Sequence, residues 1–171
     1  MLPRRTLLLA LAAALGGCGF RPMYGGVGGA DDPDIRERLA AIEVRGLDGR
    51  LGQILRNELL DQLNPVGAQV SARYLLPVQL RRFAAALGIQ LDNTVTRYNL
   101  ILVARFQLRE RGTQRVVYQS IARREASYNV SQQPFADLTA EQNAERRAAR
   151  EVSNDIRTQL AVHFAREADV T

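Results

Sequence analysis

Three segments in the middle of the chain alternate apolar and polar residues, the pattern typical of half-buried β-strands. The first covers residues 74–81 and contains Pro77, which favours a position at the edge of a sheet. The second, residues 96–109, has the clearest alternation. Residues 110–113 form a tight connection into the third, residues 115–128, whose blurred alternation is compatible with a β-bulge. We therefore expect three consecutive strands.

Segments whose apolar residues have the spacing of an α-helix lie before and after these strands in the sequence. A short strand at residues 40–45 precedes a helix at 51–63, which Asp48-Gly49 would open and Asn64-Pro65 would end. A second helix begins at residues 139–142, which match a capping box, and its apolar residues recur every four positions. These are Ala144, Ala148, Val152, Ile156, Leu160 and Phe164.

The element order is therefore β-α-β-β-β-α, which predicts an α+β fold in two layers. We expect a four-stranded, mostly antiparallel sheet with both helices on one face, in a single domain over residues 39–171. The opposite face carries more polar residues and would be available for binding.

The N-terminal 17 residues have the order of a secretory signal peptide. Arg4 and Arg5 precede an uncharged apolar run at residues 7–15, which is shorter than the roughly 20 apolar residues needed to cross a bilayer. The paired arginines also occur in twin-arginine export signals, although the flanking residues fit that route poorly. We expect residues 1–17 to be removed.

The end of this segment, residues 15–18, reads Leu-Gly-Gly-Cys and matches the bacterial lipobox. Cys18, the only cysteine, would then become the mature N-terminus and carry a covalent diacylglycerol and an N-acyl chain, which together anchor a protein stably. The alternative is an ordinary small residue beside the cleavage site of a secreted protein. Residues 18–38 would form the lipidated start and a glycine-rich flexible tether, whose ten residues at 25–34 would span roughly 17–19 Å.

Composition adds an unusual use of arginine. The chain has 46% hydrophobic and 24% charged residues, ordinary globular values, and all 23 of its basic residues are arginine. Guanidinium groups bind phosphate in two-pronged fashion, which suits an anionic partner, although a GC-rich genome also favours arginine codons. A phosphorylated lipid is a better candidate than nucleic acid for an exported, anchored protein.

No motif indicates catalysis. The chain lacks a phosphate-binding glycine loop and a G-x-S-x-G sequence, and His163 is its only histidine. With Cys18 lipidated, neither a disulfide nor a cysteine-based metal site is available. Acidic residues of the last helix alternate with arginines and are typical of a solvated face. We expect a protein that is not an enzyme and has no metal or cofactor beyond its covalent lipid.

Arginines in the predicted strands are the candidate ligand-binding residues. The proposed pairing would place Arg81, Arg97, Arg105 and Arg123 on the face opposite the helices, close enough to share a polyanionic ligand. The alternative is that these are ordinary solvated strand positions.

Several segments resemble the LptE family of lipopolysaccharide-assembly lipoproteins, in its alphaproteobacterial form. They read "CGFRPMYG" at residues 18–25, "LRNELLDQL" at 55–63 and "TRYNLILVARFQL" at 96–108. The resemblance covers essentially the whole mature chain and implies the same two-helix, four-strand fold. It also implies an outer-membrane lipoprotein on the periplasmic side, with Cys18 acylated and no enzymatic activity.

The family's role implies two partners: the outer-membrane β-barrel LptD, within which the lipoprotein sits, and lipopolysaccharide. One feature departs from enterobacterial relatives, whose basic contact residues lie near the turn that corresponds to residues 87–95, where this chain has no arginine. The alternative function is an accessory lipoprotein of another envelope machine, such as a secretin-assembly factor or a lipid-transport auxiliary.

Overall fold

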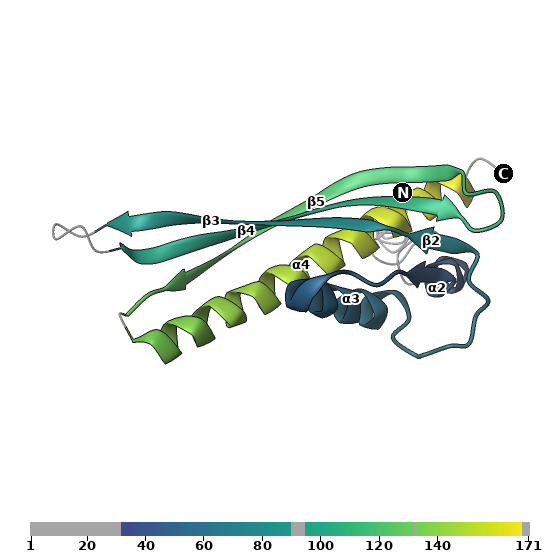
Figure 1. Ribbon diagram of the computed structural model, residues 1–171. Coiled ribbons are helices and arrows are strands. Elements are labelled where there is room, and N and C mark those ends of the chain that lie inside the picture. The colour runs from purple at the N-terminus through teal and green to yellow at the C-terminus, as the bar shows by residue number, and fades with distance from the viewer. Residues whose placement is uncertain (1–31, 90–94, 132, 169–171) are drawn as a thin grey trace, which may run out of the picture.

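The computed structural model describes residues 32–89, 95–131 and 133–168, and these form an α+β fold with three helices and five strands (Figure 1). The helices are α2 (Pro33–Ala40), α3 (Gly49–Leu63) and α4 (Pro134–Ala168), and the strands are β1 (Ile42–Val44), β2 (Tyr74–Leu76), β3 (Val78–Ile89), β4 (Val95–Glu110) and β5 (Val116–Asn129). The α+β class expected from the sequence is confirmed, whereas the predicted numbers of strands and helices are each one too low.

Strand β4 is the centre of the sheet. It pairs antiparallel with β5 along one edge, and antiparallel with β3 and then β2 along the other, while β1 adds to β2 in parallel. The register slips between Leu108 and Arg109 where β4 meets β5, which identifies an irregularity of the bulge type.

The additional strand arises at Pro77, which divides the strand predicted at residues 74–81 into β2 and β3. Proline has no backbone N–H to donate to the ladder, although its carbonyl still accepts from the Gln107 backbone N–H at 3.2 Å. The two strands follow one another along the same edge of β4. The prediction of one strand here is therefore wrong about its continuity, and β3 also extends eight residues past the expected end.

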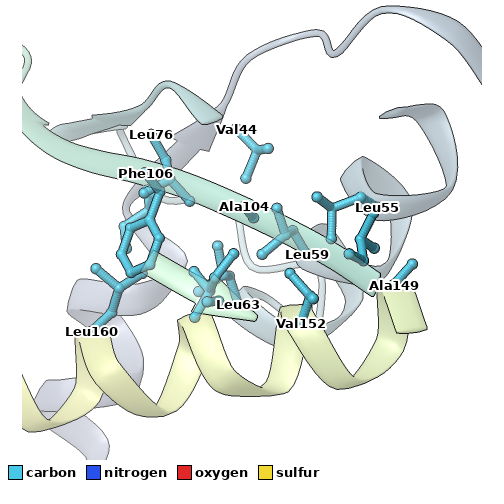
Figure 2. Close-up of a cluster of buried hydrophobic side chains, with 14 of the residues drawn as sticks. Val44, Leu55, Leu59, Leu63, Leu76, Ala104, Phe106, Ala149, Val152 and Leu160 are labelled. Atoms are coloured by element: carbon cyan, nitrogen blue, oxygen red, sulfur yellow. The ribbon is translucent and has the colours of Figure 1, made fainter. Parts of the chain in front are cut away.

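All three helices lie on one side of the sheet and leave the other side open (Figure 1). The even-numbered residues from the middle to the end of β4 face the helices. Leu100, Leu102, Ala104, Phe106 and Leu108 are all buried. Figure 2 shows the resulting core, in which Leu55, Leu59 and Leu63 of α3 meet Val152 and Leu160 of α4 beneath the sheet. Burial of these side chains, worth roughly 1.5–3 kcal/mol each, holds the two layers together.

Helix α2 corrects the predicted extent of the tether, because it occupies residues 33–40, most of which were assigned to flexible chain. Asp32 caps the helix by accepting from the Asp34 backbone N–H at 2.9 Å, and Pro33 suits its first turn. Ile35 and Leu39, four residues apart, bury one face against the core. The glycines and acidic residues before the helix obscured this short pattern.

Helix α4 begins at Pro134, five residues before the capping box predicted at Thr139. The Thr139 hydroxyl instead donates to the Phe135 carbonyl at 2.8 Å within the helix. Asp137 secures the chain ahead of the first turn by accepting from the Ser131 backbone N–H at 2.7 Å. The start and end predicted for α3 are close to those observed, with Asp48 and Asn64 as its caps.

Candidate binding face of the sheet

The open side of the sheet, called here the outer face, is formed by the odd-numbered residues within 79–85 of β3, 97–109 of β4 and 119–129 of β5. Strand register places them in rows across the three strands. One row is Arg81, Val103 and Arg123, and the next is Gln79, Arg105 and Ile121. Because side chains alternate between the two sides of a strand, these rows point away from the helices.

Three of the four predicted arginines lie together on this face. Arg81 and Arg123 flank Val103 in one row, and Arg105 belongs to the adjacent row. Arg97 is also exposed, but six residues separate it from Val103 along β4, about 20 Å at strand spacing. The structure therefore supports a three-arginine group with Arg97 apart from it.

Within the described parts of the chain, no ion pair involves Arg81, Arg97 or Arg105, whereas Arg123 is paired. Its Nη2 lies 2.7 Å from Glu125 Oε1, and the Asn99 amide donates to the other oxygen of that carboxylate at 2.6 Å. The hydrogen bonds from Asn99 and Arg123 hold the pKa of Glu125 below its usual value. Glu125 thus partly neutralises the group from one side.

Apolar side chains lie among these arginines. Phe83 and Ile121 are each 52% exposed, and Ile101 and Val103 are half-buried between them on β4. The sequence pattern did not indicate Phe83, because it predicted that the strand ends at residue 81. A face that combines guanidinium groups with exposed apolar side chains can bind a ligand that has both phosphate and hydrocarbon parts.

The arginines next to these in sequence have a different role on the helix side. Arg82 contacts Glu141 and lies 3.3 Å from Glu145, whose side chain also contacts Arg50 of α3. Arg124 lies 3.2 Å from Asp155. Glu145 is buried, so these contacts satisfy a carboxylate within the helix layer and join α3, α4 and the sheet.

His163 lies at the edge of the core, stacked on Tyr118 with 4.7 Å between ring centroids. Its Nε2 is 3.4 Å from the Glu167 carboxylate.

In the described residues no group of three or more His, Cys, Asp or Glu side chains is placed to hold a metal ion. No described helix is both long and apolar enough to span a bilayer. Cys18 and the predicted signal peptide lie outside the described residues.

The described residues therefore form an α+β domain, with helices covering one side of the sheet and arginines and apolar side chains exposed on the other. The sequence model of the LptE family, described as lipopolysaccharide assembly, matches residues 38–160. The chain belongs to the LptE family, as its sequence motifs indicated.

Solved structures of lipoproteins share this fold. A lipoprotein from Caulobacter crescentus CB15 is 29% identical, with a TM-score of 0.66 over 78% of this chain and 97% of that one. A minor lipoprotein from Acinetobacter baumannii (19% identity, TM-score 0.56) covers 72% of this chain and 90% of its own. The rare lipoprotein B from Shewanella oneidensis is 15% identical, with a TM-score of 0.53, and the match covers 75% of this chain and 96% of that one. A search of curated proteins found no match.

Proposed function

We propose that this protein is an outer-membrane lipoprotein that helps to assemble and plug the LptD barrel and to deliver lipopolysaccharide to the outer surface. The observation that carries the proposal is the family match, which covers residues 38–160 and therefore nearly all of the described fold. Its role is one of binding and assembly, without catalysis.

The anchor in this proposal is Cys18, which follows the sequence Leu-Gly-Gly. A diacylglycerol and an N-acyl chain on this residue would hold the protein on the periplasmic side of the outer membrane, because more than one chain is needed for stable anchoring. Gly19 follows the cysteine, in place of the aspartate that in many bacteria retains lipoproteins at the inner membrane.

Lipopolysaccharide is the proposed ligand of the outer face. Arg81, Arg105 and Arg123 would contact its phosphate groups, and Phe83 and Ile121 would contact acyl chains. Arg97 lies in a separate position and would meet a different part of the same large ligand.

The test is recovery of the partner from membranes with a C-terminally tagged chain. We expect the unsubstituted chain to co-purify with a large outer-membrane barrel, and its depletion to lower surface lipopolysaccharide. Cys18→Ala should abolish lipid attachment, which the mass of the chain measures directly. The proposal would be contradicted if no barrel is recovered. Depletion that leaves surface lipopolysaccharide intact but impairs secretion or phospholipid asymmetry would also contradict it, and would favour a role in another envelope machine.

A further inference from the structure

A groove of about 420 Å³ lies where α2, the end of α3, the chain that follows α3 and α4 come together, away from the outer face of the sheet. Figure 1 shows α2 and α3 on the helix side of the molecule. The apolar part of the lining includes Leu39, Leu63, Pro65, Val66 and Val70. We propose that residues 20–24, Phe-Arg-Pro-Met-Tyr, bind in this groove and hold the lipid-anchored end of the chain against the folded domain.

One wall of the groove, residues 64–68, is fixed by its own hydrogen bonds. The Asn64 side chain accepts from the Ala68 backbone N–H and donates to the Ala68 carbonyl, both at 2.9 Å. Gly67 has a φ of +65°, which favours glycine, and its N–H donates to the Asn64 carbonyl at 3.1 Å. This turn presents Val66, which is 86% exposed. Because the wall is preformed, a segment that packs on it does not have to order it first.

The described chain starts beside this groove. Asp32 caps α2, and Pro33, the first residue of that helix, already lines the groove. Nine residue steps lead from Tyr24 to Pro33, which reach about 30 Å when extended. Four of the eight residues between them are glycines, so the chain can reverse direction there at low steric cost. Residues 20–24 can therefore reach the groove without any change in the described fold.

The side chains of residues 20–24 differ from those of an ordinary tether. Phe20, Met23 and Tyr24 are large and apolar or aromatic, whereas the ten residues after them are mostly glycine and aspartate. Exposure of three such side chains to water is unfavourable, and an apolar groove within reach removes that exposure. Pro22 restricts its own backbone and that of Arg21 to extended conformations, in which short segments bind grooves with little further loss of entropy.

Two arginines favour an aromatic occupant. Arg36 of α2 and Arg157 of α4 both line the groove. A guanidinium group attracts the face of an aromatic ring, and this attraction is stronger where water is excluded. Phe20 and Tyr24 supply two rings, whereas the acyl chains expected on Cys18 supply none. The lining therefore favours residues 20–24 over the acyl chains.

Binding of this segment would bring Cys18 close to α2. Cys18 is two residues before Phe20, about 7 Å of extended chain. The lipid would then hold the domain at the membrane with α2 nearest to it, whereas the flexible tether expected from the sequence would leave the orientation of the domain free. The inference goes beyond the proposed function, because the contact requires neither lipopolysaccharide nor the barrel, and only this consequence relies on acylation of Cys18.

The test is disulfide formation between paired cysteine substitutions in the full mature lipoprotein in detergent, under one mild oxidant. Met23→Cys leaves both rings in place and is combined with Val66→Cys at the groove. The matched control combines Met23→Cys with Asp34→Cys, because Asp34 is exposed, lies two residues from Asp32 and does not line the groove. An unbound segment would meet Asp34→Cys more often, since that position is closer to the start of the described chain. We expect the groove pair to form its disulfide at least ten-fold faster than the control pair.

A second variant tests the two rings. Phe20→Ser with Tyr24→Ser, added to the groove pair, should slow its disulfide at least ten-fold. The masses of the linked peptides identify which thiols have joined, including any link to an unacylated Cys18. The inference is overturned if the control pair reacts as fast as the groove pair. It is also overturned if the serines have no effect, which would favour acyl chains in the groove, or if the disulfide joins two chains, which would identify a second copy as the occupant.

These results are separable from the proposed function. A barrel that co-purifies with a chain whose groove pair does not link would overturn only the inference. Rapid linking of the groove pair in a chain that recovers no barrel would overturn only the assembly role.

Discussion

Arg81 and Arg82 are neighbours in the chain, yet their side chains belong to different parts of the protein. Arg82 faces the helices and contacts Glu141 and Glu145, whereas Arg81 is exposed on the outer face. The difference follows from strand alternation, but the sequence pattern predicted a strand only as far as Arg81, so it did not assign Arg82 to the helix side. What alternation could not predict was which arginines had acidic partners, because Glu145 is more than 60 residues away along the chain.

The Glu125 carboxylate provides a pH test of the outer face. Hydrogen bonds from Asn99 and then from Arg123 are the main causes of its lowered pKa, so Asn99→Ala and Arg123→Gln should each raise that pKa. Because the folded-state pKa is depressed, any contribution of this group to stability is complete above the ordinary carboxyl range and is lost as pH falls through the lowered value. Carboxyl-carbon NMR titration measures both shifts, and an unchanged midpoint in Asn99→Ala would show that the amide does not contact Glu125 in solution.

At the scale of elements, long periodic segments were predictable and short or interrupted ones were not. Strand β4 and helix α3 repeat their apolar pattern often enough to stand out, and both were expected near their observed positions. The break at Pro77 could not be predicted without knowing the partner strand, because a proline is tolerated in a strand wherever its missing N–H is not needed for pairing. Helix α2 has only eight residues and two buried side chains, a pattern too brief to distinguish from a tether.

Leu39 tests whether α2 belongs to the folded domain. Its side chain is 1% exposed in the core cluster, so Leu39→Ala should lower the free energy of unfolding by about 2–5 kcal/mol. Glu37→Ala is the control, because Glu37 is exposed on the same helix and should change stability by less than about 0.5 kcal/mol. Denaturant unfolding gives both values. If the two variants are equally stable, residues 33–40 do not pack against the folded domain and belong to the tether.

Across the whole molecule, arginines that support the folded structure and arginines proposed to bind the ligand lie on opposite sides of the sheet. Arginines of the helix side join α3, α4 and the sheet through ion pairs, while those of the outer face mostly lack such partners among the described residues. The sequence predicted that such a face exists and that Arg81, Arg105 and Arg123 belong to it. It could not predict the hollow of about 580 Å³ lined in part by Pro77, Arg105 and Arg109, because strand pairing is what brings these residues together.

The double variant Arg81→Gln with Arg123→Gln tests this separation. We expect at least ten-fold weaker binding to purified lipopolysaccharide, because two guanidinium groups of one row are lost, and an unfolding free energy within about 1 kcal/mol of the unsubstituted value. Arg45→Gln with Arg56→Gln removes the same charge away from the outer face and should leave binding unchanged. Equal losses in both double variants would mean that net charge, and not this face, governs the interaction.

Helix α4 also sets a length scale for the molecule. Its 35 residues extend about 52 Å, and β4 and β5 run alongside it (Figure 1). The hydrocarbon core of a bilayer is about 30 Å thick. The helix is therefore longer than the hydrocarbon core is thick, so groups that contact opposite ends of α4 are held about 52 Å apart by one continuous element.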